Sequence, residues 1–112
     1  MRIYHNPRCM KSRQTLQLIQ DQGIEPEVIK YLDDPLSPDQ LREILDLLGI
    51  QPMDLVRNKE KIWKEEYAGK ELDDDEIILA MAENPKLIER PIVVKGKKAV
   101  LGRPPENVRE LF

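Results

Sequence analysis

Residues 1–32 read MRIYHNPRCMKSRQTLQLIQDQGIEPEVIKYL, and their pattern indicates the first elements of the chain. Residues 2–5 alternate in the manner of a short strand, which Asn6-Pro7 ends because proline lacks an N–H and biases its predecessor away from the helix. From residue 11 to 22 apolar side chains recur at helical spacing, and Gly23 follows as a C-cap would. The pattern predicts a strand, a loop and a helix.

A second strand is predicted over residues 27–32, between Pro26 and the turn Asp33-Asp34-Pro35. A helical crossover of this length returns the second strand parallel to the first, with a right-handed connection. The chain therefore opens with a βαβ unit.

The remaining elements follow from similar signals. Ser37 is a predicted N-cap with Pro38 at the first helical position, and Gly49 is a predicted helix end. Lys95-Gly96-Lys97 is typical of a hairpin turn. The predicted helices cover residues 38–48, 53–57, 60–67, 73–83 and 104–112, and the predicted hairpin strands cover residues 91–94 and 98–101.

This order of elements is that of a thioredoxin-like (glutaredoxin-like) fold. We predict an α/β protein with a mixed four-stranded sheet and an inserted helical block, forming a single domain over residues 1–112. No internal repeat or linker interrupts it.

The composition narrows the class of protein. The chain has one cysteine and one histidine, which excludes an internal disulfide and argues against a structural metal site. The formal net charge of −3 argues against nucleic-acid binding. No apolar stretch is long enough to span a bilayer and no signal-peptide pattern follows Met1, so we expect a cytoplasmic protein without a membrane partner.

The charges are unevenly distributed along the chain. Residues 1–20 contain four basic side chains and no acid, and residues 90–105 contain five basic side chains and no acid. If the two segments meet, an acidic protein carries a local positive pocket that suits a small anion. The alternative is that these are ordinary solvated surface charges.

Cys9 is the principal candidate for chemistry. It follows a strand and a proline-containing loop and directly precedes a helix, where unpaired N–H groups and the positive helix end favour thiolate over thiol. Arg8, Lys11 and Arg13 are cations close in sequence that act in the same direction. We predict a reactive cysteine, the alternative being a buried structural one.

Ser12 and His5 are the two polar residues placed to assist Cys9. Cys9-Met10-Lys11-Ser12 has the Cys-x-x-Ser form of a single-thiol redox site, in which the serine hydroxyl can donate to the thiolate but cannot resolve a disulfide. Ser12 is otherwise an ordinary first-turn residue. His5 can act through its charge or through a hydrogen bond that orders the loop. The second thiol of any redox reaction must come from another molecule.

Arg57, Arg90 and Arg103 are isolated in sequence but significant as a set. Arg90-Pro91 and Arg103-Pro104 each fix an arginine beside a proline at an element boundary, where a planar and always charged donor can grip an oxyanion. The Arg90-Pro91 bond, just before a strand, is also a candidate cis peptide.

Several blocks together are similar to one known family. The blocks are Ile3-Tyr4-His5-Asn6-Pro7-Arg8-Cys9, Tyr31-Leu32, Asn84-Pro85, Glu89-Arg90-Pro91-Ile92-Val93-Val94 and Gly102-Arg103-Pro104. In order and spacing they resemble the glutaredoxin-coupled arsenate reductase (ArsC) family, nearly from end to end.

The resemblance implies a reaction and a set of roles. In that family the cysteine, here Cys9, forms a thiolate ester with arsenate, glutathione attacks the adduct, and glutaredoxin releases arsenite. By position His5 matches the histidine that helps activate the thiol, and Ser12 matches the serine of the cysteine loop. The three arginines that hold the oxyanion correspond to Arg57, Arg90 and Arg103. Glutathione is then a co-substrate, and no bound cofactor is expected.

Two other functions stay open on the sequence. Cys9 can exchange with glutathione mixed disulfides, with the arginines binding the glutathione carboxylates. A non-enzymatic binding module of the Spx regulator type shares the fold, but that type commonly uses a Cys-x-x-Cys switch, and Ser12 removes the second thiol here.

Overall fold

The computed structural model describes all 112 residues and divides them into two compact units. The first unit comprises residues 1–34 and 90–112, and the second comprises residues 35–89. The second unit coincides with the predicted inserted helical block. That the chain forms one domain stays a prediction.

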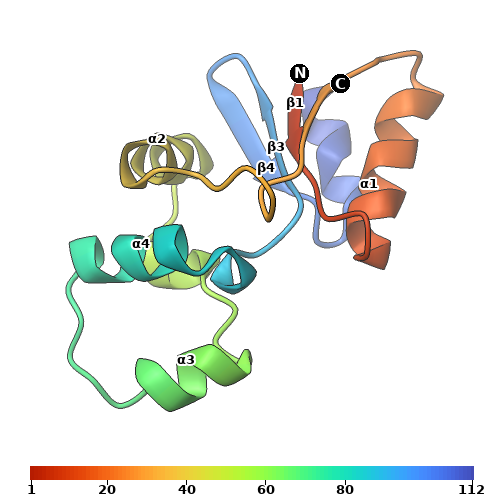
Figure 1. Cartoon of the computed structure of the whole chain (residues 1–112). Coiled ribbons are helices and arrows are strands. Elements are labelled where there is room, and N and C mark those ends of the chain that lie inside the picture. Colours follow the sequence, from red (N-terminus) through yellow and green to blue (C-terminus); the bar gives the residue numbers. More distant parts are fainter. The chain divides into compact units, whose positions relative to one another are not determined.

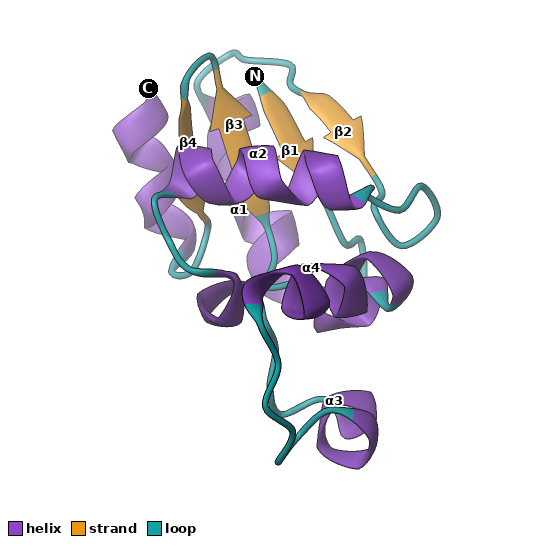
Figure 2. Cartoon of the chain, turned by 90° about the vertical axis from the view of Figure 1, so that its left-hand side faces the viewer, coloured by secondary structure: helices purple, strands orange, loops and turns teal.

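The first unit is built on a four-stranded mixed sheet in the order β2-β1-β3-β4 (Figures 1 and 2). The central strand β1 is parallel to β2, with Ile3 opposite Val28, and antiparallel to β3, with Ile3 opposite Val93. The fourth strand pairs antiparallel with β3. The bounds are β1 Arg2–Tyr4, β2 Glu27–Ile29, β3 Ile92–Lys95 and β4 Lys98–Leu101. The predicted fold class, an α/β protein with a mixed four-stranded sheet, is confirmed.

Two helical segments pack together in this unit: α1 (Met10–Asp21) and the 3₁₀ helix η3 (Pro105–Leu111). Their shared core contains Ile19 of α1 together with side chains of β1, β3 and η3. Each such side chain contributes roughly 1.5–3 kcal/mol when it is fully buried. The buried set is Ile3, Ile19, Val93, Val108 and Leu111.

The second unit consists only of helical segments. Helix α4 contacts α2 and both short 3₁₀ helices. Each of the two longer helices begins with a capping box, centred on Ser37 for α2 and on Asp73 for α4. The bounds are α2 Pro38–Leu48, η1 Pro52–Leu55, α3 Lys61–Glu66, α4 Asp74–Glu83 and η2 Pro85–Leu87.

Helix α3 is anchored by an aromatic pair. Trp63 is buried and stacks on Tyr67, with ring centroids 5.3 Å apart. The Tyr67 hydroxyl accepts a hydrogen bond from Asn84 Nδ2 at the end of α4 (3.0 Å). These contacts hold a six-residue helix that is too short to be stable alone.

Three predicted elements differ from the structure. The second strand, predicted over residues 27–32, ends at Ile29, because Asp33 N–H and Asp34 N–H both donate to the Lys30 carbonyl and close a turn. The helix predicted over 53–57 is the 3₁₀ helix η1, and the chain then extends so that Val56 bridges Ile88. The last helix is 3₁₀ rather than α-helical.

The hairpin turn and two X-Pro peptide bonds can be compared with the sequence analysis. The turn consists of Gly96 and Lys97, one residue shorter than predicted, because Lys95 still pairs with Lys98. Gly96 has φ +60°, a conformation that favours glycine. The Arg90-Pro91 bond, a candidate cis peptide on the sequence, is cis, and Arg103-Pro104, for which no isomer was predicted, is also cis.

No helix is both long enough and apolar enough to cross a bilayer.

Candidate active site

Cys9 is the N-cap residue of helix α1. Its backbone is extended (φ −93°, ψ 122°), and its carbonyl accepts from Arg13 N–H (3.0 Å). The side chain is a free, partly exposed thiol that makes no capping hydrogen bond. The first N–H groups of α1 therefore have no acceptor inside the helix, and they give this end a partial positive charge beside the sulfur.

The loop before Cys9 is a tight turn closed by its own backbone. Cys9 N–H donates to the Asn6 carbonyl (3.0 Å), and Arg8 N–H donates to Asn6 Oδ1 (3.0 Å). Arg13, one turn into the helix, donates through Nη1 to the Pro7 carbonyl (2.9 Å). Side-chain and backbone bonds together hold the backbone of Cys9 at the helix end.

Ser12 is the buried centre of this loop. Its side chain is 0% exposed, and its Oγ lies 2.7 Å from His5 Nδ1 and 3.0 Å from the Asn6 nitrogen, which donates to it. No hydrogen bond joins Ser12 to Cys9, so the predicted donation to the sulfur is absent from the structure. Ser12 instead ties the end of β1 to the first turn of α1.

His5 acts on the loop through Ser12. Asn6 N–H donates to Ser12 Oγ, so the Ser12 hydroxyl proton can point to His5 Nδ1. A neutral His5 with its proton on Nε2 leaves Nδ1 free to accept that bond, and the Asn6 N–H, the Ser12 hydroxyl and His5 Nδ1 are then all hydrogen-bonded. Burial lowers the pKa of His5, and the positive charges of Lys30 and Arg13 lower it further. Of the two roles considered for His5, the geometry favours a hydrogen bond that orders the loop.

The exposed surface around Cys9 is basic. Arg8, Lys11 and Arg13 are exposed and none of them forms an ion pair. Met10, directly after Cys9, is 64% exposed. An anion that approaches the sulfur therefore meets cationic side chains not neutralised by carboxylates.

Arg90 and Arg103 are brought side by side by the hairpin. Gly102 N–H donates to the Pro91 carbonyl (2.9 Å), which pairs the chain segments that carry the two arginines. Arg103 Nη1 donates to the Arg90 carbonyl (3.3 Å). The Nε of Arg90 is buried and has no hydrogen-bond partner. A buried guanidinium N–H without an acceptor is costly, and an oxyanion is the kind of ligand that would satisfy it.

Arg57 belongs to the second unit and is surrounded by carboxylates there. Its Nη1 lies 2.8 Å from Glu60 Oε1, and its Nε lies 4.0 Å from Glu89 Oε1. Its N–H donates to the Leu87 carbonyl (2.7 Å). Its role in holding an oxyanion stays a prediction that rests on the resemblance.

Sequence reasoning assigned no role to Thr15 or Gly102, although both are buried beside the predicted arginines. The signal that could have indicated a role for Thr15 is that a polar, β-branched residue stands at a core-facing position of the first helix.

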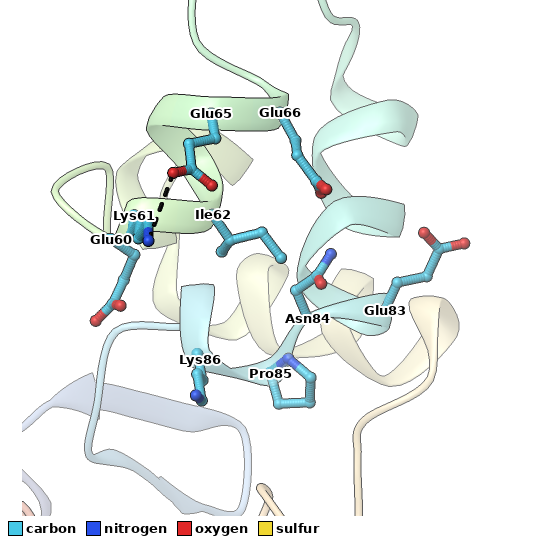
Figure 3. Close-up of a pocket in the computed structure, with 9 residues that line it drawn as sticks. All are labelled: Glu60, Lys61, Ile62, Glu65, Glu66, Glu83, Asn84, Pro85 and Lys86. Carbon is cyan, nitrogen blue, oxygen red and sulfur yellow. Dashed lines mark ion pairs between the residues drawn. The ribbon is translucent and has the colours of Figure 1, made fainter.

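A separate cavity of about 570 Å³ lies within the second unit, between α3 and the end of α4 (Figure 3). Its lining is mainly charged, with Lys61 paired to Glu65 (3.7 Å) and Ile62 pointing toward Asn84. Its lining includes no cysteine, serine or histidine. Nowhere in the chain do three metal-ligating side chains gather as a metal site would require.

Comparison with known proteins identifies the class. The model of the ArsC family matches residues 4–111. This chain belongs to the ArsC family, and its fold is the thioredoxin-like fold of that family.

Individual relatives are similar over nearly their whole length. The chain is 43% identical to an arsenate reductase of Neisseria meningitidis over 114 residues, covering 100% of this chain and 97% of that protein. It is 50% identical to YfgD of Escherichia coli K12, an uncharacterised protein, covering 99% of this chain and 95% of that one. The structure of an arsenate reductase from Vibrio cholerae superimposes with a TM-score of 0.96 at 50% identity, covering 99% of this chain and 96% of that one.

Proposed function

We propose that this protein reduces arsenate to arsenite through a Cys9 thiolate–arsenate adduct, with glutathione and glutaredoxin as reductants. The observation that carries the proposal is the place of Cys9. The only cysteine of the chain is the N-cap of α1, in a loop braced by His5 and Ser12, and its thiol is free.

The charges near this cysteine suit a tetrahedral oxyanion. Arsenate offers several anionic oxygens, and a helix N-terminus supplies both backbone donors and a partial positive charge. Arg90 and Arg103 add planar cationic donors from one turn region. Arg57 is included as the third oxyanion-binding arginine only because it matches the third arginine of the family. Donors aimed at charge that develops in a transition state are commonly the largest catalytic contribution.

The single cysteine determines where the electrons come from. Cys9 thiolate attacks arsenic(V) and displaces one oxygen as water or hydroxide. Reduction to arsenic(III) then needs two electrons, and two external thiols supply them by forming one disulfide. Glutathione displaces a second oxygen from arsenic as water. A glutaredoxin thiol then attacks the glutathione sulfur, which forms the mixed disulfide and leaves the electron pair of the arsenic–sulfur bond on arsenic. Hydrolysis of the Cys9–arsenic bond releases arsenite.

The names of the relatives support this substrate, because the similar proteins of Neisseria meningitidis and Vibrio cholerae are arsenate reductases. A cytoplasmic location fits the same chemistry, since thiols stay reduced there.

The test is arsenite formation by the purified protein with arsenate, glutathione and a glutaredoxin. Cys9→Ser should abolish turnover, and Arg90→Ala should lower kcat/KM by roughly 100-fold. Arg109→Ala removes an exposed arginine of η3 and serves as the matched control, with activity unchanged. No arsenite from a wild-type protein whose Cys9 is readily alkylated would contradict the proposal and favour mixed-disulfide exchange.

A further inference from the structure

One face of helix α1 carries three fully buried side chains, Ser12, Thr15 and Ile19. Their spacing of three and four places them in one row along the helix. Ser12 holds the cysteine loop, and Ile19 lies in the hydrophobic core. Thr15, between them, is also buried, and outside α1 its hydroxyl contacts neither the cysteine loop nor the hydrophobic core but the segment around Gly102.

Thr15 faces the turn that carries Arg103. Its Oγ1 lies 2.8 Å from the Lys11 carbonyl oxygen of the same helix and 3.4 Å from the carbonyl oxygen of Gly102. The hydroxyl has one proton, which it shares between the nearer Lys11 carbonyl and the carbonyl of Gly102, the residue directly before Arg103.

The packing at this bridge leaves no free space. A Cβ built on Gly102 would lie 2.5 Å from Thr15 Oγ1, 3.0 Å from Thr15 Cγ2 and 2.7 Å from Pro91 Cγ. Glycine is therefore required for close approach, because the chain must pass between the helix and Pro91. Both branches of the Thr15 side chain lie close to the position that this Cβ would occupy.

The turn itself is braced on its other side. Asn107 Nδ2 donates to the carbonyl oxygens of Leu101 and Arg103, both at 3.2 Å. Gly102 N–H donates to the Pro91 carbonyl, and Arg103 donates to the Arg90 carbonyl. These bonds link the segments that carry the two arginines to Gly102, and Thr15 is the residue of α1 that contacts Gly102.

We propose that Thr15 is a positioning residue that holds the Gly102–Arg103 turn against helix α1, and so sets both Arg90 and Arg103 relative to Cys9. The helix is the rigid link, since Cys9 caps it and Thr15 lies roughly 9 Å further along its axis. The inference rests on the proposed function, in which these arginines bind the oxyanion that Cys9 attacks.

The test separates the hydroxyl from the shape of the side chain. Thr15→Val keeps the two branches and removes the hydroxyl, whereas Thr15→Ser keeps the hydroxyl and removes the methyl group. Gln14→Ala, at an exposed position of the same helix, is the control. For each variant we would measure KM and kcat for arsenate, and the rate of Cys9 alkylation by uncharged iodoacetamide.

We expect Thr15→Val to raise the arsenate KM about five-fold, the factor expected for loss of one ordinary hydrogen bond. Its Cys9 alkylation rate should equal that of the wild type, and Thr15→Ser should have a nearly normal KM. A wild-type KM in Thr15→Val, or equal impairment in Thr15→Ser, would overturn the proposal. So would a parallel loss of alkylation, because that would indicate a disturbed cysteine loop.

A second measurement does not depend on turnover. Inorganic phosphate, a tetrahedral anion that cannot be reduced here, should protect Cys9 from iodoacetamide, and Thr15→Val should need about five times more phosphate for half-protection. If the wild type forms no arsenite but shows this difference, the proposed function fails and the positioning role stands. If phosphate protects both proteins equally, the positioning role fails, whatever the activity. If phosphate protects neither, the oxyanion site fails as well.

Discussion

Replacing Ser12 with alanine should destabilise the protein and loosen the cysteine loop. The substitution removes the oxygen that accepts from Asn6 N–H and that lies 2.7 Å from His5 Nδ1. Both partners are buried, and a buried polar group left without a partner costs about 1–3 kcal/mol. We therefore expect a loss of about 2 kcal/mol in the free energy of unfolding.

This loss is large enough to measure by thermal or urea unfolding. For a chain of this length it corresponds to a fall in Tm of about 8 °C. Ser37→Ala is the matched control, because Ser37 is the only other serine and caps α2 by accepting from Gln40 N–H (3.2 Å). Removing that exposed cap should cost about 1 kcal/mol.

The two variants should differ at the cysteine loop. In Ser12→Ala the Asn6 amide should lose protection from hydrogen exchange, whereas in Ser37→Ala its protection should fall only as far as global stability does. The reasoning would be refuted by a Ser12→Ala protein with the wild-type Tm and an equally protected Asn6 amide.

Three further perturbations test individual contacts. Gly102→Ala should lower the free energy of unfolding, measured in urea, by about 2–3 kcal/mol through overpacking. Adding Thr15→Ala should recover part of this loss, because it removes two of the three atoms close to the new Cβ. Fully additive losses of stability for the two substitutions would contradict the packing. Because the folded-state pKa of His5 lies below its ordinary 6.5, the unfolded chain binds the proton more readily. The stability that neutral His5 provides is therefore complete above about pH 6.5 and decreases as the pH falls toward the lower folded value. Urea midpoints across that window should show a slope that His5→Gln reduces, and equal slopes would contradict the burial argument. Asp73→Ala should lower the free energy of unfolding by about 1 kcal/mol while Asp73→Asn keeps most of the cap, so equal stability of the two variants would argue against this N-cap.

The fold could be predicted because its signals are local. The alternation near Ile3, the helical spacing before Gly23 and the glycine in the hairpin each act within a few residues of the chain. The end of β2 could not be predicted, because Lys30 and Tyr31 continue the strand pattern while a turn closed by the Lys30 carbonyl overrides it.

The site was predictable only where it depends on residues that are close in sequence. The position of Cys9 at a helix start follows from neighbouring residues, and the structure has it there. The partners of Ser12 depend on the end of β1 folding back on the helix. The role of Thr15 depends on Gly102, 87 positions along the chain. Spacing rules carry no information about such contacts.

In the proposed reaction the Cys9 sulfur attacks arsenic and external thiols then reduce it. The most direct measurement is the intact mass of the protein after incubation with arsenate and glutathione without glutaredoxin. We predict an adduct of one arsenic and one glutathione per chain that requires arsenate and is absent from Cys9→Ser. Glutathione attached to Cys9 without arsenic, at the same level whether or not arsenate is present, would contradict it.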